Sequence, residues 1–405
     1  MRSFSGFSIV KVFICLVLYS FSSTLHAQKP DYANLEYAKV KGASLKLDLY
    51  LPKKMQGKLP LIVWIHGGGW KYGNKSSAFQ AARLLLPKGY AVAGINYRLS
   101  QDSIFPAQLN DCKAAIRFLR ANARKFSIDP ERIGVWGSSA GGHLSALLGT
   151  TGGVMTSVSG GIMMNIEGSV GGYFDYSSRV QAVCDFYGPT DFLRMDGYHL
   201  QPRSNESMLI GGPIRKNIDR CMLANPIRYV SPDDPPFFIA HGTKDPVVPF
   251  NQSDILNKAL KQAFSKNRKE VVFYPVKDAI HGGKAFDSEV LLKRVVSFFD
   301  RNLKEPKLET DPLSENPDRF DLGQNYPNPF NPFTIINYSI QSPGPVNLEV
   351  FDCRGREVAH LVKGYAMPGS YSISFNPSKA VRGGIYYYRL TAGKNTMSRK
   401  MLLLR

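Results

Sequence analysis

Cysteine is scarce in this chain of 405 residues: five are present, and no two of them form a C-x-x-C pair. The sequence therefore offers no thiolate cluster of the kind that holds a metal. Charged residues are also few, at 20%, against 43% hydrophobic and 12% aromatic residues. This composition argues against long intrinsic disorder and predicts a sizeable packed core.

Acidic residues number 32 against 51 basic ones, which gives a formal net charge of +19. A positive charge suits a nucleic-acid partner, but the Lys and Arg residues are scattered and form no basic stripe interleaved with aromatic residues. We therefore expect a solvated basic surface and no nucleic-acid partner.

The apolar run near the N-terminus is shorter than the roughly 20 residues that cross a bilayer. Arg2 and Lys11 precede this run, residues 12–21, and Leu25-His26-Ala27 follows it. Such a pattern predicts a signal peptide, residues 1–27, cleaved after Ala27. We expect no integral membrane segment after signal cleavage.

Export permits disulfides among the cysteines that remain after cleavage. These are Cys112, Cys184, Cys221 and Cys353. Cys184 and Cys221 are candidates for a disulfide or for two buried free thiols, and the sequence leaves both possibilities open.

The first half of the chain has the pattern of an α/β fold. Residues 45–51 alternate apolar and polar side chains and predict a half-buried strand, paired with residues 35–40 across Lys41-Gly42. Helical stretches are expected at residues 111–124 and 288–303. The buried strands are expected at residues 61–65, 90–95, 132–136, 180–186, 237–240 and 271–276. Continuous apolar strands between helices predict a mostly parallel sheet with helices on both faces.

The length and the change of texture predict two folded domains. We expect an α/β domain over residues 28–303, a polar, Pro-interrupted linker over 304–324, and an all-β domain over 325–405. About seven short strands separated by Gly, Pro and Asn turns predict a small β-sandwich.

A candidate nucleophile lies in Gly137-Ser138-Ser139-Ala140-Gly141, which fits G-x-S-x-G. The motif follows the expected strand 132–136 and opens a helical stretch, the strand–turn–helix setting that holds a nucleophilic serine on a tight elbow. The register makes Ser139 the nucleophile. The G-x-S-x-G pattern alone is weak evidence for a nucleophile, because Gly and Ser are common residues. The prediction rests on its position between a strand and a helix.

A glycine loop, His66-Gly67-Gly68-Gly69-Trp70, ends the strand at 61–65. Backbone N–H groups of Gly68 and Gly69, together with that of Ala140, are expected to form an oxyanion hole. The alternative is an ordinary glycine turn between a strand and a helix. This is disfavoured because the glycine loop and the elbow at Ser139 occur together, about 70 residues apart, as in the same template.

The base is expected to follow the acid, because this fold brings its residues together in the chain order Ser, Asp or Glu, His. His281 follows the last expected strand, and Asp245 follows the strand before it. Asp278 is the rival acid, too near His281 in sequence to reach across the ring easily. The remaining histidines are set aside by their positions: His26, His66, His143, His199, His241 and His360.

The segments HGGGW, GSSAGGH, FYGPTD, SPDDPPFFIAHGTKDPVVP and IHGG together resemble the carbohydrate-esterase branch of the α/β-hydrolases over residues 37–303. The resemblance implies a Ser139, Asp245 and His281 triad that hydrolyses short acyl esters, acetyl or feruloyl, on plant cell-wall polysaccharides. It implies no metal and no organic cofactor. Ser138 departs from the acidic residue of hormone-sensitive-lipase-like relatives. Residues 151–176 correspond to a lid or acyl-pocket insertion, or to a surface loop.

Residues 325–405, which begin NYPNPFNP, resemble the C-terminal sorting domain of type IX secretion substrates. This resemblance implies the type IX secretion machinery as a partner and a secreted or cell-surface location. The tyrosines at 386–388 also allow a carbohydrate-binding platform, but strand alternation places Tyr386 and Tyr388 on one face and Tyr387 on the other. We therefore expect Tyr386 and Tyr388 to be core residues.

The sequence thus predicts an exported serine carboxylesterase. Two alternatives stay open: a serine peptidase of the prolyl-oligopeptidase type, which shares the elbow and the triad order, and a catalytically inactive surface-binding protein on a hydrolase scaffold. The short segment between the signal peptide and the first hydrolase strands disfavours the peptidase, because such enzymes carry a large propeller there.

Overall fold

The computed structural model describes residues 29–54, 57–265, 269–304, 320–325, 328–331, 334–366, 368–377 and 381–404. The expected signal peptide, residues 1–27, and most of the expected linker lie outside the described residues. The domain bounds 28–303, 304–324 and 325–405 therefore stay predictions.

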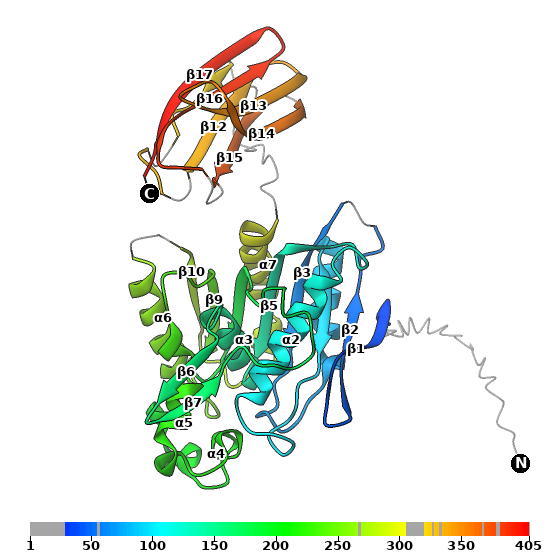
Figure 1. The fold of residues 1–405 in the computed structure, drawn as a ribbon, viewed down its shortest axis with the longest axis vertical. Helices are drawn as coiled ribbons and strands as arrows, with labels where there is room; N and C mark the ends of the chain where they lie inside the picture. Colours follow the sequence, from blue (N-terminus) through cyan, green and yellow to red (C-terminus); the bar gives the residue numbers. More distant parts are fainter. Residues whose placement is uncertain are drawn as a thin grey trace, which may run out of the picture.

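A mostly parallel eight-stranded sheet forms the centre of the first unit (Figure 1). Its strands lie in the order β1 (Tyr32–Val40), β2 (Ala43–Tyr50), β4 (Ala91–Ile95), β3 (Leu59–Ile65), β5 (Ile128–Ser138), β8 (Ala182–Phe186), β9 (Phe237–Gly242) and β10 (Val271–Val276). The pairings β1–β2 and β2–β4 are antiparallel, and the others are parallel. The predicted α/β fold with an antiparallel edge is confirmed.

Helices cover both faces of this sheet because alternate residues of each buried strand point to opposite sides. In β3, Leu61 and Val63 join the core under α2, α3 and α6, whereas Ile62 and Trp64 join the core under α1 and α7. The helices are α1 (Phe79–Leu85), α2 (Ala107–Ala121), α3 (Ala140–Thr150), α4 (Asn205–Ile210), α5 (Ile218–Ala224), α6 (Asn251–Ala263) and α7 (Glu289–Leu303). Short 3-10 helices are η1 (Lys75–Ala78), η2 (Leu86–Lys88), η3 (Phe192–Arg194), η4 (Gly197–Leu200), η5 (Ile214–Lys216), η6 (Pro226–Tyr229) and η7 (Lys284–Asp287).

Helix α2 begins one turn earlier than its predicted start at residue 111. Pro106 stands immediately before the first helical residue, a position where the missing N–H of proline costs nothing. Asp111 consequently lies inside the helix, fully buried, and binds the guanidinium of Arg98 at 2.6 Å. The missed first turn, residues 107–110, contains the polar Gln108 and Asn110, which hid it from a purely apolar periodicity.

The glycine-rich insertion, residues 151–176, carries a hairpin of β6 (Thr156–Ser159) and β7 (Ile162–Asn165). It is anchored to α2 through Glu167, whose carboxylate accepts from the buried side chains of Lys113 at 2.8 Å and Arg117 at 2.6 Å. Ser159 also donates to Asp219 of α5 at 2.7 Å. These contacts tie the insertion to α2 and α5, so it is not a loosely held surface loop.

The described residues of the second unit form seven strands in two antiparallel sheets. One sheet contains β11 (Asp321–Leu322), β12 (Thr334–Ile340) and β15 (Gly369–Phe375). The other contains, in spatial order, β14 (Glu357–Ala366), β13 (Gly344–Asp352), β16 (Gly384–Ala392) and β17 (Asn395–Leu403). Both sheets contribute to one apolar core. Tyr386 and Tyr388 are 7% and 0% exposed, whereas Tyr387 is 43% exposed, so the predicted division of the three tyrosines is confirmed.

The four cysteines at positions 112, 184, 221 and 353 are free thiols. Cys184 and Cys221 are both buried and do not form a disulfide. Of the two possibilities that the sequence left open, the structure has the buried free thiols. Their apolar surroundings make them small hydrophobic core residues.

Glu167 should be a strong determinant of stability, because its loss leaves two buried cations without their carboxylate. The side chains of Lys113 and Arg117 are each 1% exposed. We expect Glu167→Gln to lower the free energy of unfolding by about 3–5 kcal/mol, measured by urea denaturation. The control is Glu289→Gln, which removes an exposed ion pair with Lys293 and should leave the midpoint unchanged. Equal midpoints for the two variants would contradict the role given to Glu167.

Asp185 on β8 should make stability fall with rising pH. Its side chain is fully buried; one oxygen accepts from the N–H of Gly188 at 2.9 Å, and the other has no partner within the described residues. Burial raises the pKa of this carboxyl from 3.8 to about 6. The folded state therefore holds the proton more tightly than the unfolded state, and stability is lost as pH rises through the window between these two values.

We expect Asp185→Asn to remove this loss. At pH 8 the variant should be more stable than the natural chain by about 3 kcal/mol, and at pH 4 the difference should nearly vanish. Urea denaturation of both chains at several pH values measures the difference, and a constant difference across the range would contradict the assignment.

Candidate active site

Ser139 lies on a sharp turn between β5 and α3, with backbone angles φ 55° and ψ −122°. The turn is crowded: a Cβ atom at Gly137 would lie 2.2 Å from the carbonyl oxygen of Gly141, and one at Gly141 would lie 2.0 Å from that of Ile65. Only glycine fits either position. The N–H of Ser139 donates to the carbonyl of Phe186 at 2.8 Å, which ties the turn to the next strand.

His281 connects Ser139 to Asp245. Its Nε2 atom lies 3.0 Å from the Oγ of Ser139, and its Nδ1 atom lies 2.7 Å from an oxygen of Asp245. The serine hydroxyl thus donates to the ring, and the ring donates to the carboxylate. Asp278 takes no part: it is exposed and pairs with Lys244 at 2.9 Å. The structure brings Ser139, His281 and Asp245 together and leaves Asp278 outside.

The carboxylate of Asp245 is fully buried, with every oxygen occupied. Its Oδ1 accepts from the N–H groups of Val247 at 2.8 Å and Val248 at 2.9 Å. Its Oδ2 accepts from His281, and His241 lies 3.3 Å away. Burial favours the protonated form, but the hydrogen bonds from His241, His281 and Val248 outweigh it and hold the pKa of Asp245 below its usual range. The carboxyl group therefore stays ionised at neutral pH.

The glycine loop after β3 lies directly against the elbow. A Cβ atom at Gly67 would lie 2.7 Å from the carbonyl oxygen of Ser138. Gly68 has φ 108°, a conformation that favours glycine, and a Cβ atom there would lie 2.4 Å from the carbonyl oxygen of Tyr72. Within the described part of the chain, the N–H groups of Gly68 and Gly69 donate to no acceptor.

The N–H of Ala140 is at the first position of α3, where no intrahelical acceptor exists. The N–H groups of Gly68, Gly69 and Ala140 thus belong to the two segments that meet at Ser139. Such groups suit the stabilisation of a negatively charged oxygen.

Tyr187 and Phe286 were not predicted from the sequence. The ring of Tyr187 meets the ring of His281 edge to face, with centroids 4.6 Å apart, and contacts Phe286 at the same distance. Burial raises the pKa of Tyr187 to about 12, against a smaller lowering effect of Ser138, so the hydroxyl keeps its proton. The sequence offered one indication that Tyr187 lies at the site: it directly follows a buried strand.

Three further histidines of the first unit bind elsewhere. His143 is fully buried, its Nε2 atom lies 2.8 Å from the carbonyl oxygen of Ala224, and burial lowers its pKa to about 4. His66 contacts the carbonyl of Gly67, and His199 pairs with Glu206 at 2.9 Å. None of the three bonds to Ser139 among the described residues.

Among the described residues, Glu349, Glu357 and His360 place ligand atoms within 4.8 Å of one another. Glu349, however, already pairs with Arg389 at 3.0 Å. A guanidinium at this distance competes with a cation, so these residues make a poor metal site.

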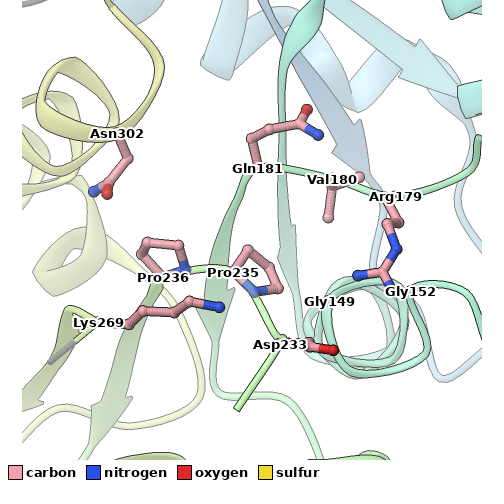
Figure 2. A pocket seen from close by; sticks show the side chains of 10 residues that line it. All are labelled: Gly149, Gly152, Arg179, Val180, Gln181, Asp233, Pro235, Pro236, Lys269 and Asn302. Carbon is pink, nitrogen blue, oxygen red and sulfur yellow. The ribbon is translucent and has the colours of Figure 1, made fainter. Parts of the chain in front are cut away.

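A pocket of about 380 Å³ lies at the amino ends of the parallel strands. Figure 2 shows the side chains that line it. Its lining includes Gln181 before β8, Pro236 before β9 and Lys269 before β10. Ser139 lies after the carboxyl end of β5, at the other edge of the sheet. The pocket is therefore separate from the Ser139 site.

No helix among the described residues has the length and apolar character needed to cross a membrane.

Two family models match the chain. The model described as BD-FAE matches residues 47–260, and the model described as a secretion system C-terminal sorting domain matches residues 324–404. The first match lies within residues 37–303, where the sequence resembles an α/β-hydrolase esterase, and the second coincides with the segment that resembles a sorting domain, so both resemblances are confirmed.

Solved structures with the same fold include a truncated carbohydrate esterase from gut microbiota, with 38% identity and a TM-score of 0.62, covering 67% of this chain and 95% of that one. A bifunctional GH43-CE protein of Bacteroides eggerthii has 41% identity and a TM-score of 0.61, covering 67% of this chain and 35% of that one.

Among curated proteins, the probable carboxylic ester hydrolase LipM of Mycobacterium tuberculosis is 33% identical over 215 residues, which are 51% of this chain and 47% of LipM. The chain spans about half the length of the curated relatives it matches. The BD-FAE match covers more than half of the chain, and on this ground the protein belongs to the BD-FAE family of α/β-hydrolases.

Proposed function

We propose that the protein is a carboxylic ester hydrolase that works through an acyl-enzyme on Ser139. The observation that carries the proposal is the hydrogen-bonded line from the Oγ of Ser139 through His281 to the buried carboxylate of Asp245, at 3.0 and 2.7 Å. Such a line of nucleophile, base and acid activates a serine hydroxyl that is otherwise a weak nucleophile. The names of relatives such as LipM, a probable carboxylic ester hydrolase, and LipQ, an esterase, support ester hydrolysis.

In the first half of the reaction, Ser139 Oγ attacks the carbonyl carbon of the ester and passes its proton to Nε2 of His281. The carbonyl oxygen becomes an oxyanion, which the N–H groups of Gly68, Gly69 and Ala140 stabilise. The carbon–oxygen bond to the alcohol then breaks, and the alcohol leaves with the proton from His281. Asp245 holds the ring in the required tautomer and stabilises its charged form.

In the second half, a water molecule gives a proton to His281 and attacks the acyl carbon. The same N–H groups stabilise the second oxyanion. The bond to Ser139 breaks, the proton returns to its Oγ, and the carboxylic acid is released. The sum of both halves is one ester and one water converted to one alcohol and one acid.

The proposed substrates are short acyl esters, acetyl or feruloyl, on plant cell-wall polysaccharides. The support comes from solved structures named as a carbohydrate esterase and as a bifunctional GH43-CE protein, at 38% and 41% identity. Both are more similar to this chain in sequence than the curated relative LipM, at 33%.

The proposed route out of the cell uses both ends of the chain. Residues 1–27 are the proposed signal peptide, and the C-terminal domain, proposed to span 325–405, is the partner of the type IX secretion machinery. The match of residues 324–404 to a secretion system sorting domain supports this part. The proposed location is secreted or on the cell surface.

The Ser139→Ala variant should lose ester hydrolysis by a factor on the order of 10³ or more, because the acyl-enzyme route requires the hydroxyl. The measurement is the rate of p-nitrophenyl acetate cleavage by the purified chain. Ser297→Ala, an exposed Ser-to-Ala change on α7, is the matched control and should keep the natural rate. Equal rates for the natural chain and Ser139→Ala would remove the enzyme assignment.

A substrate panel tests the acyl and carbohydrate specificity. We expect cleavage of p-nitrophenyl acetate, and of acetylated xylan or methyl ferulate, with lower kcat/KM for long-chain p-nitrophenyl esters. A prolyl amide should not be cleaved. Preference for long acyl chains would overturn the carbohydrate-esterase proposal but not ester hydrolysis, whereas cleavage of the prolyl amide would favour a peptidase.

A further inference from the structure

His241 is a fully buried histidine that the proposed reaction does not use. It lies on β9, four residues before Asp245, and its side chain is 0% exposed. Its Nδ1 atom lies 2.7 Å from the hydroxyl of Ser253, and its Nε2 atom lies 2.9 Å from the carbonyl oxygen of Val248. The same Nε2 atom lies 3.3 Å from Oδ2 of Asp245. A buried ring with both nitrogens occupied has a fixed orientation.

The contacts of His241 determine where its proton lies. A carbonyl oxygen and a carboxylate oxygen only accept hydrogen bonds, so Nε2, which faces both, must carry a hydrogen. The hydroxyl of Ser253 either donates to or accepts from Nδ1, whichever the protonation of the ring requires. In every case, therefore, His241 presents an N–H to Asp245.

We propose that His241 is a positioning residue for Asp245, holding Oδ2 of the carboxylate toward His281. The proposal rests on the roles given above to Ser139, His281 and Asp245. It adds a residue to the line. Ser253 binds His241, whose Nε2–H bonds to the carbonyl oxygen of Val248 and lies 3.3 Å from Oδ2 of Asp245. Asp245 accepts from His281, which accepts from Ser139.

The geometry around Asp245 explains why a second histidine is needed. Oδ1 is held by the N–H groups of Val247 and Val248. Without His241, Oδ2 would have His281 as its single donor, and a buried carboxylate oxygen short of donors is costly. The rings of Tyr187 and Phe250 pack against His241, with ring centroids 6.4 Å and 5.6 Å from its own. Asp185 on the neighbouring strand is a further carboxyl group whose charge acts on His241.

The test compares His241→Phe with His241→Gln. Phenylalanine keeps the ring volume and removes the donor, whereas the glutamine amide can place an N–H where Nε2 lies. We expect His241→Phe to lower kcat for p-nitrophenyl acetate by about 10- to 100-fold, by analogy with the range found for groups that orient metal-ligating side chains. KM should change by less than about twofold, because no substrate contact is lost. His241→Gln should recover most of kcat.

The pH profile separates positioning from a structural role. With the donor removed, more negative charge stays on the side of Asp245 that faces His281, which favours the charged ring. The acidic limb of kcat/KM should therefore move to higher pH in His241→Phe and return in His241→Gln. The proposal would be overturned if kcat of His241→Phe stayed within about twofold of that of the natural chain. It would also be overturned if both variants lost kcat equally and the acidic limb of kcat/KM stayed at the same pH. If His241→Phe does not fold, His241→Met replaces it in the same comparison.

A second readout separates this inference from the proposed function. Diisopropyl fluorophosphate reports on activation of Ser139 without any ester substrate: the Oγ–phosphorus bond forms, the phosphorus–fluorine bond breaks, fluoride leaves, and His281 takes the serine proton. Mass spectrometry should show slower labelling in His241→Phe and near-natural labelling in His241→Gln. If the natural chain is labelled but cleaves no ester, the proposed function fails while this comparison still decides the role of His241. If the natural chain is not labelled at Ser139, both fail.

Discussion

The close approach of three backbone segments at Ser139 is the constraint on which the rest of the site depends. The elbow, the end of β3 and the start of α3 lie so near one another that Gly137 and Gly141 have no room for a Cβ atom. Ser139 itself has φ 55°, and a non-glycine residue in such a conformation costs about 1–3 kcal/mol. The surrounding packing maintains it: β5 is paired on both sides, and every residue of α3 is buried. Core packing thus sets the direction of the Ser139 hydroxyl.

The buried carboxyl groups of this protein differ in the number of hydrogen-bond donors and cations that surround them. Asp245 has donors on both oxygens, from two backbone N–H groups and two histidines, so it can stay ionised without solvent. Glu167 is neutralised by two buried cations and anchors the glycine-rich insertion. Asp185 has an oxygen without a partner among the described residues, and its pKa is raised accordingly. The ionised acid is therefore the fully hydrogen-bonded one, which is the condition for orienting a histidine at neutral pH.

The C-terminal unit is a pair of antiparallel sheets packed around one core, unlike the sheet of the first unit, which is covered by helices on both faces. Its strands alternate inward apolar and outward polar residues, and both sheets share one core. Tyr388 both fills this small core and satisfies its own polar group. Its ring is buried, while its hydroxyl donates to the carbonyl of Gly323 and accepts from the N–H of Asn325, both at 2.8 Å. Among the described residues of this unit, none bonds to Ser139, Asp245 or His281.

The sequence by itself determined the class of fold, the order of its strands along the chain, and the loops on which Ser139, Asp245 and His281 stand, because periodicity and glycine-containing turns are local properties. It also determined that Tyr386 and Tyr388 share a core face, since side chains alternate along a strand. The sequence also favoured Asp245 over Asp278 as the acid, and the contact with His281 agrees with that preference. The tertiary structure alone decided that Cys184 and Cys221 stay apart, and that His241 and Tyr187 lie beside the site. These depend on contacts between segments far apart in the chain, which no local pattern encodes.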